Sequence, residues 1–176
     1  GVTLEMTIGA ERYQALTVAL STYQVPADYI NRMKPWAAMM TLSTPPPVTG
    51  FFMDLSLSLR ASGSGLKVIG LETLEQQLSF LEDMPIEMQI SLLEQAVNEF
   101  DQVNAVHDEM VDVYLKGDLH QLQQLAEEQM LEAGDVVMDY FLETGIFARN
   151  ERMSETLLQQ LADKTVFAAV GALHLP

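Results

Sequence analysis

The chain has no cysteine, few basic residues and no long apolar run. Without cysteine, disulfides, thiol nucleophiles and thiolate metal sites are all excluded. Only 9 Lys and Arg residues stand against 25 Asp and Glu residues, which gives a formal net charge of −16. A surface this negative repels phosphate backbones and anionic bilayers, so we expect no nucleic acid partner. No apolar run approaches the roughly 20 residues that a membrane-spanning helix needs.

The sequence also lacks a start methionine and a basic-then-apolar leader, and it opens in mid-pattern with Gly1-Val2-Thr3-Leu4. We therefore expect it to be a piece of a longer protein. Its 176 residues match about one domain, and 48% of them are hydrophobic. A chain of this size buries roughly two-thirds of its unfolded surface, so a folded core is expected rather than disorder.

Apolar residues at three- and four-residue steps predict helices along most of the chain. Tyr13, Leu16 and Leu20 line one face of a helix over about 10–23, and short helical turns follow Pro26 and Pro35. Longer helices are predicted over 52–61, 74–82, 86–105, 107–116, 119–131, 135–144 and 148–162. A capping box, Thr73 with Gln76, is predicted to start the helix at 74–82.

Two short apolar segments, 66–71 and 165–171, are bounded by turn residues and predict β-strands. Continuous apolar runs of this kind suit strands buried on both faces of a parallel sheet. Two strands alone make a poor sheet, so they should belong to a larger one. The predicted class is α+β, predominantly α-helical with two short strands from a larger sheet. Unpaired strand edges further predict a homodimer.

Three polar residues are candidates for chemistry. His174 and Glu72 follow the two predicted strands, and ligands in α/β sheets collect beyond the carboxyl ends of strands. Imidazole plus carboxylate is a common ligand set for a hydrolytic metal, while Arg149 could clamp an anion. Each candidate also has a purely structural interpretation. His174 can be a polar residue where a strand reaches the surface, Glu72 a carboxylate favoured at a helix N-terminus, and Arg149 part of a surface ion pair. His107 and His120 are expected on the solvated surface.

Several stretches resemble a known family when taken together and in order. They are Lys34-Pro35-Trp36-Ala37, Gly50 to Asp54, Ile69-Gly70-Leu71-Glu72-Thr73 with Gln76-Gln77-Leu78, Arg149-Asn150 with Met153, and Phe167 to His174. This combination resembles the TraB/GumN proteins, which are related to the Tiki metalloproteases. The resemblance spans nearly the whole chain and is more specific than any single stretch.

The resemblance implies a divalent-metal hydrolase, in the Tiki branch a peptidase, whose site uses two G-x-x-H motifs and at least one glutamate. Gly171-Ala172-Leu173-His174 matches the second motif, and Glu72 matches the glutamate after the central strand. The family's first G-x-x-H motif lies on an N-terminal strand, and none occurs there in this sequence; the one earlier match to the spacing, Gly117-Asp118-Leu119-His120, lies at the start of the helix predicted over 119–131. We therefore expect residues 1–176 to be the central and C-terminal part of a single TraB/GumN domain, without the first G-x-x-H segment and the final strand and helix.

In this interpretation His174 binds the metal, Glu72 binds it or poises the attacking water, and Arg149 holds an anionic part of the substrate. The implied metal is manganese, cobalt or zinc, and the implied substrate is a peptide or protein. With half of the site missing, the chain alone should be inactive and should bind metal only loosely. The alternative is a non-catalytic helical module that binds a protein or sequesters a ligand. Many relatives look exported, which favours a periplasmic or membrane-associated setting in a bacterium and leaves membrane association itself open.

Overall fold

A computed structural model describes residues 2–162 and 165–175 of the chain. Its α-helices are α1 (Leu4–Ile8), α2 (Ala10–Ser21), α3 (Ala27–Ile30), α4 (Pro35–Leu42), α5 (Met53–Gly63), α6 (Leu74–Glu82), α7 (Ile86–Asn98), α8 (Val103–Lys116), α9 (Leu119–Glu132), α10 (Asp135–Tyr140) and α11 (Ala148–Leu161). Three short elements of other helix types are η1 (Phe100–Gln102), η2 (Phe141–Phe147) and η3 (Ala172–His174). The segment η2 is a π-helix, and the other two are 3₁₀ helices.

The predicted α+β class is wrong, because helices make up 72% of the described residues and none of these residues forms a strand. The segments 66–71 and 165–171 have irregular backbone instead. They are largely exposed: Leu66 is 65% and Phe167 82% accessible. A strand forms only when its backbone pairs with a neighbour, and neither segment pairs with the other or with a third part of the described chain. The apolar sequence of these segments is typical of strands, but the backbone hydrogen bonds to a neighbouring strand that would make them strands are absent from the described chain.

The predicted helices are confirmed over most of the chain. The capping box is present, with the Thr73 hydroxyl accepting from the backbone of Gln76 and the Gln76 side chain accepting from the backbone of Thr73. The long helix predicted over 86–105 is interrupted after Asn98 by η1. This break lets Phe100 pack against Tyr23, with ring centroids 6.0 Å apart. The helix thus ends earlier than its apolar spacing predicts, and the break accompanies an aromatic contact between residues distant in the sequence.

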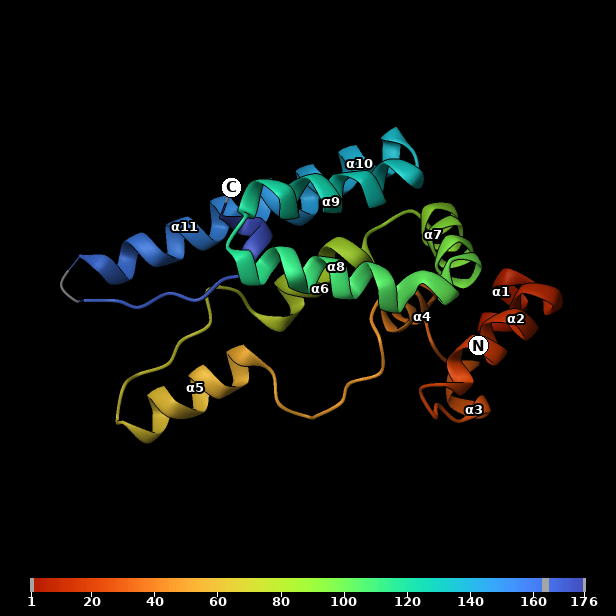
Figure 1. Ribbon diagram of the computed structural model, residues 1–176, viewed down its shortest axis with the longest axis horizontal. Coiled ribbons are helices and arrows are strands. Elements are labelled where there is room, and N and C mark those ends of the chain that lie inside the picture. The colour runs from red at the N-terminus through yellow and green to blue at the C-terminus, as the bar shows by residue number, and fades with distance from the viewer. Residues whose placement is uncertain (1, 163–164, 176) are drawn as a thin grey trace.

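The main hydrophobic core lies among α1, α2, α3, α4 and α7, at one end of the molecule (Figure 1). Its most deeply buried side chains are Leu16, Leu20, Ile30, Leu42 and Leu93. Helices α8, α9, α10 and η2 pack in sequence order, and α11 continues from η2 toward the other end (Figure 1). The helix α5 buries none of its own residues and extends below the other helices in the view of Figure 1. None of the described helices is both long enough and apolar enough to span a bilayer.

Candidate functional site

Polar side chains from three distant segments meet where the C-terminal end of the chain lies beside the start of α11 (Figure 1). Glu72 comes immediately before the N-cap of α6, Arg149, Asn150 and Arg152 come from α11, and His174 ends η3. We call these five residues the polar cluster. The three residues predicted from the sequence, Glu72, Arg149 and His174, therefore lie together, although their functional roles stay predictions.

A buried ion pair forms the centre of the polar cluster. The Glu72 carboxylate accepts from Nη2 of Arg149 at 2.7 Å and from Nε at 3.1 and 3.2 Å. Both side chains are shielded from solvent, with 8% of Glu72 and 13% of Arg149 exposed. Arginine suits this position because its planar fork of donors matches the two oxygens of a carboxylate.

Two further contacts hold Arg149 in place. Its Nη1 donates to the carbonyl oxygen of Gly145 at 3.4 Å, and its guanidinium carbon lies 5.6 Å from the centre of the Phe80 ring. The guanidinium thus stacks on an aromatic face while it pairs with Glu72. These contacts link α6 and the π-helix η2 to the start of α11.

Arg152 adds a second guanidinium near Glu72. Its Nη2 lies 3.7 Å from Oε1 of Glu72, and its side chain is 39% exposed. Its Nε is buried and has no hydrogen-bond partner within the part of the chain that the structure describes. A buried unsatisfied donor is costly, so this nitrogen is available to an acceptor on a bound molecule.

His174 is held through one of its two ring nitrogens. Its Nδ1 lies 2.6 Å from the amide oxygen of Asn150, and an amide oxygen only accepts, so Nδ1 carries the proton in the neutral ring. Burial lowers the pKa of His174 below its usual range, and the positive charge of Arg149 lowers this pKa further, while Glu72 partly offsets both. The imidazole is therefore neutral at pH 7, with a lone pair free on Nε2.

One member of the polar cluster has the form that a metal-binding histidine takes. A neutral imidazole whose other nitrogen is fixed by an oxygen acceptor is the usual form of a histidine ligand, so His174 fits this role. Glu72 does not fit it as placed, because both of its oxygens accept from Arg149. Residues 2–162 and 165–175 contain no group of three or more metal-binding side chains. A catalytic metal usually takes three protein ligands, so the described residues do not form a complete metal centre.

Sequence reasoning missed how several neighbours act in this cluster. Asn150 and Arg152 lie within three residues of Arg149 but were not among the three candidates, yet Asn150 fixes the tautomer of His174. Phe80 and Gly145 gave no signal of their own. The only local signal is that Gly145 precedes Arg149 by four residues, a spacing that allows the arginine to donate to the Gly145 carbonyl oxygen. His107 and His120 are exposed, as predicted.

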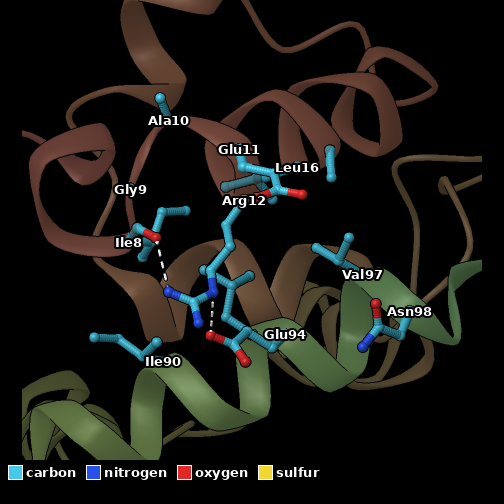
Figure 2. Close-up of a pocket in the computed structure, with 12 residues that line it drawn as sticks. Ile8, Gly9, Ala10, Glu11, Arg12, Leu16, Ile90, Glu94, Val97 and Asn98 are labelled. Atoms are coloured by element: carbon cyan, nitrogen blue, oxygen red, sulfur yellow. Dashed lines mark hydrogen bonds and ion pairs between the residues drawn. The ribbon is translucent and has the colours of Figure 1, made fainter.

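A cavity lies between α2 and α7, beside the main hydrophobic core (Figure 2). Its volume is about 540 Å³, and two of its charged lining residues, Arg12 and Glu94, pair with each other. Nη1 of Arg12 donates to the carbonyl oxygen of Ile8 at 3.2 Å, and Nε of Arg12 lies 2.5 Å from a Glu94 oxygen (Figure 2). None of the polar cluster's residues lines this cavity, so it is separate from the candidate site.

Comparison with known proteins gives one finding. The sequence model described as the TraB/PrgY/gumN family matches residues 1–176. Neither the curated proteins nor the solved structures contain a significant match to the chain.

Proposed function

The chain belongs to the TraB/PrgY/gumN family, and we propose that it carries part of the active site of a metal-dependent hydrolase that acts on peptide bonds. The observation that carries the proposal is the state of His174. Its ring is neutral, Nδ1 pairs with Asn150, and Nε2, near the charges of Arg149 and Glu72, has no hydrogen-bond partner among the described residues. Three segments separated by 77 and 24 residues along the chain converge to make this arrangement.

His174 is the proposed metal ligand, through Nε2. When bound, a divalent ion such as manganese, cobalt or zinc would polarise a carbonyl and lower the pKa of a bound water. Asn150 holds the imidazole plane by accepting from Nδ1, so little orientational freedom is lost when Nε2 binds. The nearby positive charge of Arg149 also disfavours protonation of Nε2, which keeps the lone pair available near neutral pH.

Arg149 is the proposed anchor for an anionic oxygen of the substrate or of a tetrahedral intermediate. Its hydrogen bonds to Glu72 and Gly145 use three of the five N–H donors of a guanidinium. The remaining two donors, together with the unsatisfied Nε of Arg152, can bind an oxyanion. In this arrangement Glu72 positions Arg149, and it would become a ligand only after the guanidinium moved away.

One observation favours the non-catalytic alternative, a helical module that binds a protein or sequesters a ligand. Both oxygens of Glu72 already accept from Arg149, and the positive charge of Arg149 near His174 opposes the approach of a cation. The two functions differ in one measurable property, which is whether the free nitrogen of His174 binds a divalent metal.

The test is a calorimetric titration of the 176-residue chain with zinc, cobalt and manganese. We expect one loose site, because a single fixed imidazole leaves most ligand positions to water, and we expect no peptide hydrolysis. His174→Gln should abolish the binding, whereas the matched control His120→Gln should keep it. Tight binding by the wild type, or binding that survives His174→Gln, would contradict the assignment of the ligand. Complete absence of binding at millimolar metal would favour the non-catalytic module.

A further inference from the structure

Residues 45–71 form a segment that projects from the rest of the molecule, and we call it the α5 arm. It consists of α5 and parts of the irregular connections on both sides of this helix. None of its residues is buried, and Figure 1 shows it apart from the other helices. Among the described residues a single weak hydrogen bond joins the arm to another helix, from the Tyr114 hydroxyl of α8 to the Met53 sulfur at 3.8 Å. A helix in water owes most of its stability to packing, so the arm lacks the packing partner that its helix needs.

The α5 arm exposes enough apolar surface for one side of a stable interface. Its large exposed apolar residues are Val48, Phe51, Phe52, Met53, Leu59, Leu66, Val68 and Ile69. At about 150–200 Å² for each such residue when fully accessible, their exposed fractions amount to roughly 900 Å², most of it apolar. The largest apolar patch on a typical monomer covers about 300–600 Å², and a stable protein interface buries about 800 Å² on each partner. The arm alone therefore supplies the area that one partner contributes.

The α5 arm also differs in charge from the rest of the chain. It contains one acidic residue, Asp54, and two basic residues, Arg60 and Lys67, so its net charge is +1. Since the whole chain carries −16, the remaining residues carry −17. Neither Arg60 nor Lys67 forms an ion pair within residues 2–162 and 165–175. Two copies of so acidic a chain repel each other over most of their surface, whereas the arm of one copy attracts the acidic surface of another.

One side of α8 has the chemistry that complements the arm. It carries Asp108, Val111, Asp112 and Leu115, whose spacing of three and four residues aligns them along the helix. All four residues are exposed, and we call them the α8 face. Its two carboxylates can pair with the basic residues of an arm, and its two apolar side chains can cover part of the arm's apolar surface.

We infer that two copies of the chain form a symmetric dimer in which the α5 arm of each copy docks on the α8 face of the other. The chain's own arm leaves this face open, because it touches α8 through Tyr114, which lies about 100° round the helix from Leu115. A two-fold axis makes the two contacts equivalent, so each copy gives one arm and receives one. The dimer covers both arms and brings opposite charges together, and it does not depend on the proposed hydrolase.

The test is sedimentation equilibrium of the 176-residue chain and of two charge-reversed variants. Arg60→Glu with Lys67→Glu reverses the arm, and Asp108→Lys with Asp112→Lys reverses the α8 face. For each variant alone, the Kd of the dimer should rise at least about tenfold, because both equivalent contacts become repulsive. An equimolar mixture of the two variants should restore the dimer, since each reversed surface then meets its opposite charge. The α8 variant carries less net negative charge than the wild type, so overall repulsion cannot explain its loss of dimer.

The apolar part of the contact is tested with Phe51→Ser. Its matched control is Leu158→Ser on α11, because Phe51 is 70% and Leu158 67% accessible. Phe51→Ser should raise the Kd of the dimer at least about tenfold, since a large aromatic side chain is buried at both contacts, whereas Leu158→Ser should leave the Kd unchanged.

Each other outcome contradicts a stated part of the inference. A wild-type chain that stays at the 19.6 kDa of one copy, or a dimer that survives reversal of the arm or Phe51→Ser, would overturn the role of the arm. Variants that dissociate alone and are not restored by mixing would overturn the α8 face as the docking site. No residue of the polar cluster lies in the arm or on the α8 face, so metal binding at His174 and the dimer can fail separately.

Discussion

Replacing Glu72 by glutamine tests how strongly the buried ion pair holds the start of α6 against α11. The substitution keeps the shape of the side chain but leaves the positive charge of Arg149 with 13% of its side chain exposed. Breaking a buried pair by removing one partner costs about 3–5 kcal/mol. Arg149 keeps the Gly145 carbonyl and the Phe80 ring, and a glutamine oxygen still accepts one hydrogen bond. We therefore expect a loss of about 2–3 kcal/mol in the free energy of unfolding.

The assay is urea unfolding followed by far-ultraviolet circular dichroism, with wild type and variants at one pH and ionic strength. Asp28→Asn is the matched control, because Arg32 and Asp28 form a 3.6 Å pair with both side chains 77% exposed. Such a pair contributes less than about 0.5 kcal/mol. A loss for Glu72→Gln no larger than that for Asp28→Asn would refute the reasoning that burial makes this pair important.

A double-mutant cycle separates the interaction energy of Glu72 with Arg149 from the effects of their other contacts. Arg149→Met alone leaves a buried carboxylate, with only Arg152 at 3.7 Å to offset its charge. Glu72→Gln combined with Arg149→Met removes both charges, so the double variant should lose less stability than the sum of the single variants. Simple additivity of the two losses would show that the side chains do not interact.

Three further predictions concern protonation, packing and assembly. The pKa of His174, measured by NMR, should lie below its usual value; Arg149→Met should raise it and Glu72→Gln should lower it further. Because the pKa of His174 is lower in the folded than in the unfolded state, the stability that the neutral ring contributes is present above pH ~6.5 and is lost as the pH falls through the folded-state pKa. His174→Gln should remove this pH dependence of the free energy of unfolding. Leu16→Ala should cost about 3 kcal/mol of unfolding free energy, because Leu16 is fully buried, whereas the exposed control Val18→Ala should cost less than about 0.5 kcal/mol. Sedimentation equilibrium should show a dimer, since the two exposed apolar segments remain without partners in the described chain, and a clean 19.6 kDa monomer at high concentration would contradict this.

Local features of the sequence predicted the helical part of the fold. Thr73 and Gln76 form a capping box from residues three positions apart, so the box can be identified without any tertiary information. The strands at 66–71 and 165–171 could not be decided in this way. A strand depends on a partner distant in sequence, and neither segment has one among the described residues. Spacing also could not distinguish the π-helix η2 from a continuation of α10.

Three of the five members of the polar cluster were predictable from the sequence, but their contacts were not. Their positions along the chain and the resemblance to TraB/GumN proteins together singled out Glu72, Arg149 and His174, and these three do lie together. The ion pair between Glu72 and Arg149 joins residues 77 positions apart, and nothing in a single sequence indicates that the arginine saturates the carboxylate. The hydrogen bond from His174 to Asn150 likewise depends on how η3 folds back onto α11.

The most direct test of the account is a ¹H–¹⁵N spectrum of the histidine rings at pH 7.5, recorded before and after addition of zinc. The account predicts that His174 carries its proton on Nδ1 before zinc is added, with Nε2 unprotonated. On addition of zinc, the Nε2 signal of His174 should move while Nδ1 stays protonated, and both changes should be absent in His174→Gln. A proton on Nε2 of His174, or an Nε2 signal that does not respond to zinc, would contradict the central claim that this nitrogen is the metal ligand.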